Sequence, residues 1–98
     1  MLVLLYFLAG WVEGWTASGR TSPSMTITMG DENLPKRSAW AAIEGEEVMA
    51  QLTVWETGEC EAEAYRIDPG EAVLRESAQI SSVEELHSLL RKVVAVCE

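Results

Sequence analysis

Glutamates are the residues of this 98-residue chain whose number and spacing first suggest chemistry. Seven of them fall between Glu44 and Tyr65, a segment without Lys or Arg, and Glu59, Glu61 and Glu63 alternate with small residues. General acid–base catalysis needs two carboxylates in different environments, and three exposed glutamates in one row offer no such asymmetry. A calcium site needs a loop that wraps the ion, which a flat strand does not provide. The row therefore indicates either a solvated sheet face or a binding face with anionic character.

The other reactive side chains have no catalytic partner in the sequence. His87 is the only histidine, and without a Ser–His–Asp or Cys–His signature we expect a surface or boundary residue. Cys60 and Cys97 lack CxxC spacing and a nearby histidine, which argues against zinc. We expect free, buried thiols, although one disulfide is possible in an oxidising compartment. With neither GxGxxG nor a P-loop present, we expect no cofactor and no enzyme activity.

Aromatic residues accompany the glutamates. Trp55 and Tyr65 are of the types enriched among interface anchors. Alternation places Trp40 on the same face as Gln51, away from the core side. Three interpretations follow for Trp40: a helix also covers that face, the register is wrong by one residue, or Trp40 anchors a partner. The predicted partner-binding residues are Trp40, Trp55, Glu59, Glu61, Glu63 and Tyr65.

A set of short strands must position these residues. Residues 38–43, 48–55, 59–67 and 72–80 are β-type runs separated by short turns, which is typical of an antiparallel meander, and residues 25–29 add a fifth strand. Apolar residues at helical spacing predict helices over residues 1–15 and 83–96. A capping box, Ser81 with Glu84 or Ser82 with Glu85, begins the second helix. We therefore predict one α+β domain over residues 1–98, with both helices packed on one face of the sheet.

The turn between the third and fourth runs sets their register. A three-residue loop over residues 56–58 places Val54 opposite Cys60 and Leu52 opposite Ala62, so apolar residues share one face. A two-residue turn would place Val54 opposite Glu61 and mix core with charge. The longer loop requires Gly58 in a left-handed conformation, which glycine permits.

The charge balance and the N-terminus limit the possible partners. Sixteen acidic against seven basic residues give a net charge of −9, which argues against nucleic acid and anionic membrane and permits a basic protein partner. Residues 1–12 resemble the apolar core of a signal peptide. However, no Lys or Arg precedes them, Glu13 follows at once, and a bilayer needs about 20 apolar residues. We expect a buried helix there.

Several segments together resemble the TriTu-type immunity proteins. These segments are LPKRSAW (34–40), VMAQLTVWETGECEAEAYRIDPGE (48–71) and SSVEELHSLLRKV (81–93). QLTVWETGE, residues 51–59, is the most specific, and the resemblance covers residues 34–94. It implies an immunity protein whose partner is an interbacterial toxin delivered by a secretion system, such as type VI. The implied toxin is an ADP-ribosyltransferase that modifies elongation factor Tu. The alanine-rich run over residues 61–65 departs from the Leu, Val or Ile that the resemblance implies.

Three functional hypotheses follow. The first is a cytoplasmic immunity protein that binds a cognate toxin domain and occludes it. The second is a small secreted or periplasmic binding domain with a signal peptide and a Cys60–Cys97 disulfide. The third is a hydrolase that reverses the toxin's modification, which needs a cleft with convergent acids. The sequence does not determine the oligomeric state.

Overall fold

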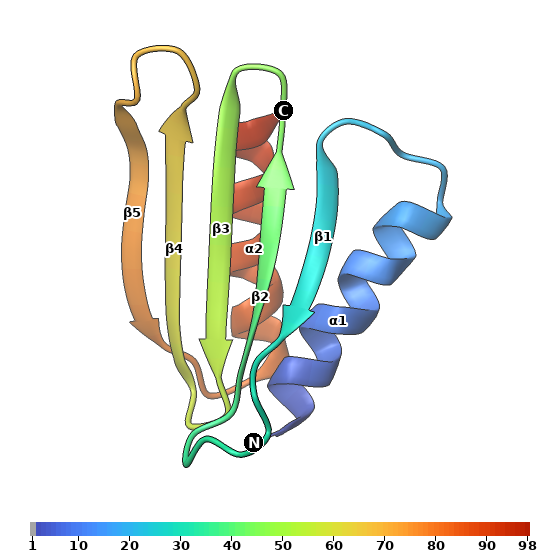
Figure 1. Ribbon diagram of the computed structural model, residues 1–98, viewed down its shortest axis with the longest axis vertical. Coiled ribbons are helices and arrows are strands. Elements are labelled where there is room, and N and C mark those ends of the chain that lie inside the picture. The colour runs from blue at the N-terminus through green and yellow to red at the C-terminus, as the bar shows by residue number, and fades with distance from the viewer. Residues whose placement is uncertain (1) are drawn as a thin grey trace.

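A five-stranded antiparallel sheet carries both helices on one face (Figure 1). The computed structural model describes residues 2–98. The elements are α1 (Leu2–Ala17), β1 (Ser24–Met29), β2 (Ser38–Glu44), β3 (Val48–Trp55), β4 (Glu59–Arg66), β5 (Ala72–Gln79) and α2 (Val83–Cys97). The strands lie in chain order, β1-β2-β3-β4-β5. The predicted α+β meander with two terminal helices is confirmed, although Met1 of the predicted first helix lies outside the described residues.

Small residues make up much of the side of the sheet that faces the helices, beside the larger Ile43, Leu52 and Val54. The buried alanines there are Ala39, Ala41, Ala50, Ala62 and Ala64. The helices supply much of the volume, and their leucines that are at most 1% exposed are Leu4, Leu5, Leu8, Leu86 and Leu90. Alanine on the strands leaves room for these larger side chains, each of which contributes about 1.5–3 kcal/mol on full burial. The alanine-rich β4 is therefore matched by leucine-rich helices.

The apolar N-terminal stretch is part of this core. Leu4, Leu5 and Leu8 of α1 pack in the same cluster as Ala41 and Ile43 of β2. Loss of residues 1–15 with a cleaved signal peptide would remove these leucines from the core. No helix among residues 2–98 is long and apolar enough to span a membrane.

Helix α2 is fixed at both ends. At its start the Ser82 hydroxyl accepts a hydrogen bond from the Glu85 backbone N–H at 3.2 Å, so Ser82 is the N-cap of the predicted Ser82–Glu85 pair. The Glu85 carboxylate accepts a hydrogen bond from the Ser81 hydroxyl at 2.6 Å, where a complete capping box would direct it to Ser82. At its end the Cys97 carbonyl lies against the β2–β3 turn, where a Cβ built on Gly45 would stand 2.2 Å from that oxygen. Only glycine permits this close contact between α2 and the turn.

The predicted register between β3 and β4 is confirmed. Val54 lies opposite Cys60 and Leu52 opposite Ala62. Gly58 in the connecting loop has a φ of 98°, the left-handed conformation that the three-residue loop requires. The same register places Tyr65 opposite Met49 on the other face of the sheet.

Candidate functional site

The helix-free face of the sheet holds all six predicted partner-binding residues. Side chains alternate between faces along each strand, so the positions between the buried alanines point away from the helices. Trp40 on β2 lies between Thr28 of β1 and Thr53 of β3, and Glu61 of β4 follows Thr53. By the same register, Trp55, Glu59, Glu63 and Tyr65 occupy this face of β3 and β4. We call this helix-free side of the five-stranded sheet the open face.

The surroundings of Trp40 exclude two of its three interpretations. The register of β2 agrees with the alternation, and both helices of residues 2–98 pack on the opposite face. Covering by a helix and a one-residue register error are therefore both wrong. Trp40 is half-buried among its cross-strand neighbours. Its role as a partner anchor stays a prediction.

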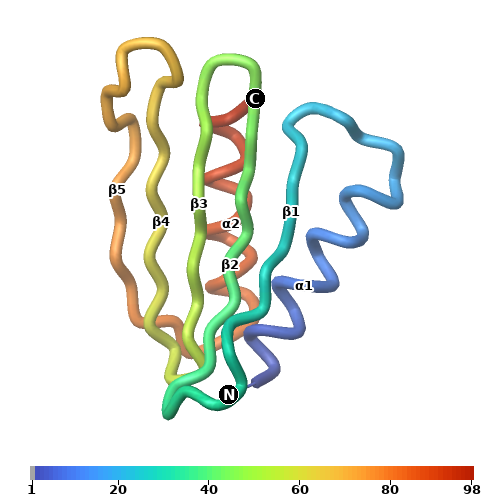
Figure 2. Tube along the Cα trace, in the orientation of Figure 1, coloured from blue at the N-terminus to red at the C-terminus, as the bar shows by residue number. Residues whose placement is uncertain are grey.

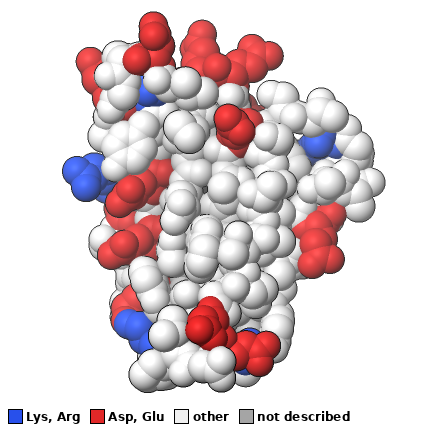
Figure 3. All heavy atoms as spheres, in the orientation of Figure 1, with Lys and Arg blue, Asp and Glu red and all other residues white. Residues whose placement is uncertain are grey.

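The middle of the open face is uncharged. Ala42, Gln51 and Thr53 surround Trp40 there, and Met49 beside Tyr65 is 47% exposed. Figure 3 shows mostly uncharged surface over this middle region, with acidic side chains along the β4 side and at the upper and lower ends. An aromatic and uncharged centre with a charged rim is the usual anatomy of a protein–protein interface.

Lys36 compensates one end of the glutamate row. Its Nζ forms a hydrogen-bonded ion pair with the Glu59 carboxylate and lies 5.3 Å from the centroid of the Trp55 ring. The bond from Lys36, followed by the one from the Thr57 hydroxyl, lowers the pKa of Glu59 below its ordinary value of 4.5. A general acid needs a raised pKa, so Glu59 is unsuited to that role.

The other two glutamates have different neighbours. Glu63 accepts a hydrogen bond from the Tyr65 hydroxyl at 3.1 Å and lies opposite Arg75 of β5. Glu61 is exposed, and its cross-strand neighbours, Thr53 and Ser77, are neutral. The prediction that the three glutamates are equivalent was wrong. Lys36 pairs with Glu59 and Arg75 lies opposite Glu63, and both cations come from outside residues 44–65.

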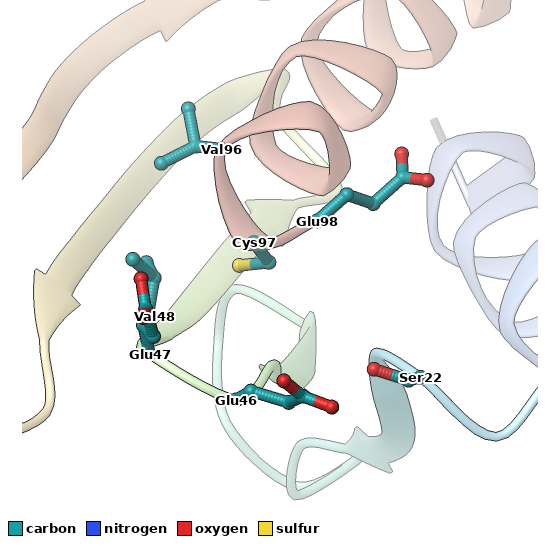
Figure 4. A pocket seen from close by; sticks show the side chains of 7 residues that line it. All are labelled: Ser22, Glu46, Glu47, Val48, Val96, Cys97 and Glu98. Atoms are coloured by element: carbon teal, nitrogen blue, oxygen red, sulfur yellow. The ribbon is translucent and has the colours of Figure 1, made fainter.

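A hollow between the β2–β3 turn and the end of α2 also contains carboxylates. It is lined by Ser22, Glu46, Glu47, Val48, Val96, Cys97 and Glu98. Figure 4 shows the Glu46 side chain directed toward Ser22 while that of Glu98 points away from it. The acids do not converge, and residues 2–98 contain no group of three or more His, Cys, Asp or Glu placed to hold a metal ion. This hollow therefore gives no support to the hydrolase hypothesis.

The two cysteines lie at opposite ends of the sheet. Cys60 pairs with Val54 near the end of β3, whereas Cys97 lies against Gly45, just before β3 begins. The intervening length of β3 separates them by about 20 Å, while a disulfide needs Cα atoms within about 7 Å. The Cys60–Cys97 disulfide is therefore wrong, and both thiols are free and buried as predicted. Burial, followed by the charges of Glu61 and Glu76, raises the pKa of Cys60 to about 12.

His87 lies where the two helices meet. Its ring stands edge-on to Phe7 and Trp11 of α1, with centroids 6.0 and 6.4 Å away. Trp15 stacks on Trp11 and donates its indole N–H to the Pro23 carbonyl at 2.8 Å. The half-buried position of His87 confirms its expected place at the boundary of the core.

Comparison with known proteins agrees with the resemblance seen in the sequence. A search among curated proteins finds no match. The family model described as immunity protein TriTu matches residues 11–96, from the middle of α1 to the last turn of α2. This span includes every strand and all six predicted partner-binding residues. The chain therefore belongs to the TriTu immunity protein family.

Proposed function

We propose that this chain neutralises a cognate toxin domain by binding it through the open face and occluding it. Membership of an immunity protein family supports a toxin as the partner. The observation that carries the choice of surface is the position of Trp40, Trp55 and Tyr65 on a sheet face that α1 and α2 leave uncovered. Aromatic residues of this kind dominate the binding energy of many interfaces.

The size of the molecule is adequate for this role. A standard interface buries about 800 Å² on each partner, which is about one seventh of the 5727 Å² that the chain exposes. The uncharged centre excludes water around the aromatic anchors, while the acidic rim speeds encounter with a basic surface. Binding alone accounts for protection, because a covered toxin cannot reach its substrate.

The proposed toxin is an ADP-ribosyltransferase that modifies elongation factor Tu. The resemblance of residues 34–94 to TriTu-type immunity proteins supports this choice. Elongation factor Tu works in the cytoplasm, so the immunity protein is proposed to act there. The net charge of −9 favours a toxin whose substrate-binding cleft is basic.

Co-purification with a catalytically inactive toxin domain tests the complex. The sharper test of the surface compares two charge reversals of equal size. Glu61→Lys with Glu63→Lys alters the rim of the open face, whereas Glu13→Lys with Glu98→Lys alters α1 and the end of α2. We expect the first pair to slow association about tenfold at low salt, and the second pair to change it far less. Equal association rates for the two variants would remove the open face from the proposal.

An assay with modified elongation factor separates occlusion from enzymatic reversal. The chain is added at about one part in a hundred to ADP-ribosylated elongation factor Tu after the toxin has been removed. Occlusion predicts that the modification stays. Removal of the ADP-ribose over many turnovers would instead establish the hydrolase hypothesis.

A further inference from the structure

The two edges of the sheet are built differently. At one edge, β5 has an irregular pairing with β4 at Ala64 and Tyr65 and carries the charged residues Arg75 and Glu76. At the other edge, β1 has the sequence SMTITM, without charge or proline, and pairs regularly with β2 over six residues. Bulges and charges are the usual protection of an edge strand against further pairing. Edge β1 lacks both.

The free backbone groups of β1 can be assigned from its pairing. The Gly30 N–H donates to the Ser38 carbonyl at 2.8 Å, and hydrogen-bonded pairs alternate along an antiparallel ladder. The backbone groups of Thr26 and Thr28 therefore bond to β2. Those of Met25, Ile27 and Met29 point outward, to the side on which no other strand of residues 2–98 lies.

Helix α1 provides a second layer beside this edge. It packs behind β1, and Figure 2 shows its C-terminal half extending beyond the strand. Trp11 faces α2 through its contact with His87, so the line of residues at positions 2, 9 and 16 lies on the opposite flank. Leu2, Ala9 and Thr16 on that line are apolar or small.

We propose that the cognate toxin contributes an extended segment that pairs with β1 as a sixth strand of the sheet. This inference rests on the proposed function. Backbone hydrogen bonds to Met25, Ile27 and Met29 would hold the segment, as in other complexes formed by strand addition. Its alternate side chains are apolar or small toward α1, and uncharged or basic on the open face. There they continue past Thr26 and Thr28 to Trp40, so the edge and the open face form one surface.

A second copy of the chain fits this edge less well. Symmetric pairing of two β1 strands would bring the overhanging half of each α1 into the helix layer of the other copy (Figure 2). Each copy also carries a net charge of −9, so the two repel each other. A segment of a toxin with a basic surface has neither difficulty.

Amide hydrogen exchange followed by NMR tests the proposal without any substitution. In the free chain the outward amides of Met25, Ile27 and Met29 should exchange rapidly, and in the toxin complex about 100-fold more slowly. The amide of Thr28, which bonds to β2, should be protected in both states. The outward amide of Ser77 on β5 should stay unprotected and serves as the control edge.

A pair of variants isolates the backbone hydrogen bond. Ile27→Ala and Ile27→Pro both remove the Ile27 side chain, but only proline removes the outward N–H. We expect Ile27→Pro to bind the toxin domain about tenfold more weakly than Ile27→Ala. Circular dichroism checks that both variants fold, and Met29→Pro against Met29→Ala repeats the comparison at a more exposed position.

The outcomes separate this inference from the proposed function. A complex in which the three outward amides exchange as fast as in the free chain would overturn strand addition and leave occlusion by the open face intact. Failure of the unaltered chain to bind the toxin domain would overturn both. Protection of these amides in the free chain that grows with its concentration would assign the edge to a second copy, and so overturn the toxin segment.

Discussion

Replacing Trp15 should mainly lower the stability of the fold, whereas replacing Trp40 should mainly weaken toxin binding. Trp15 is 9% exposed, stacks on Trp11 and donates to the Pro23 carbonyl. Trp15→Ala should therefore lower the free energy of unfolding by about 3–5 kcal/mol for the lost ring and by about 1 kcal/mol more for the unpaired Pro23 carbonyl. Trp40 is half-buried, so Trp40→Ala forfeits about half the buried area of a tryptophan, which amounts to about 1–2 kcal/mol. For a chain of this length each kcal/mol lowers Tm by about 4–8 °C.

The binding effects should run in the opposite order. As an anchor of the open face, Trp40 should contribute about 2 kcal/mol to toxin binding, so Trp40→Ala should raise Kd about 30-fold. Trp15→Phe keeps a ring in the core and should leave Kd within about threefold of the unaltered chain, since Trp15 lies on the helix side. Urea unfolding and titration calorimetry measure the two quantities. A Trp40→Ala variant that binds normally, or that is as unstable as Trp15→Ala, would refute the assignment of Trp40 to the interface.

Three further predictions concern the scaffold. Gly10→Ala should raise the free energy of unfolding by about 1 kcal/mol, because a Cβ there meets no atom within 4 Å and alanine favours the helix. Gly45→Ala should lower the free energy of unfolding by about 1–3 kcal/mol, because its Cβ collides with the end of α2. Equal Tm values for the two variants would contradict the close contact at Gly45. The pKa of Cys60 is raised to about 12, so a thiol reagent at pH 8 should label Cys60 only after the chain unfolds, and rapid labelling of the native chain would be inconsistent with its burial. The free energy of unfolding should fall as the pH rises above about 9, because the thiol of the unfolded chain ionises at lower pH than that of the native chain. In an NMR titration Lys36→Met should return the pKa of Glu59 toward 4.5, and an unchanged value would show that Lys36 does not cause the shift.

The sequence predicted the strands and their register because both depend on local features. Alternation along β3 and β4 distinguishes the two faces without any knowledge of the fold. The length of the loop at Gly58 then fixes which residues lie opposite one another. These two features were sufficient to place Tyr65 opposite Met49 and to bring the five predicted residues of β3 and β4 to one face, and alternation along β2 added Trp40.

Several properties of the site depend on residues that are distant in the chain. Lys36 reaches Glu59 because β2 pairs with β3, and Arg75 lies opposite Glu63 because β5 pairs with β4. A count of charges within residues 44–65 cannot include either cation. The segment LPKR just before β2 was the available signal for Lys36, since the first residue of β2 pairs with Trp55.

Local sequence patterns thus determined the helices and strands of this protein, the two faces of each strand, and the alignment of Glu59, Glu61 and Glu63 in one row. The tertiary structure decided which sheet face the helices cover, that Cys60 and Cys97 lie too far apart to bond, and that β1 rather than β5 is the unprotected edge. The physical reason is that periodicity and turn length act between neighbours in sequence. Packing of α1 and α2 on the alanine-rich side depends instead on the shape of the whole sheet, which no single segment encodes.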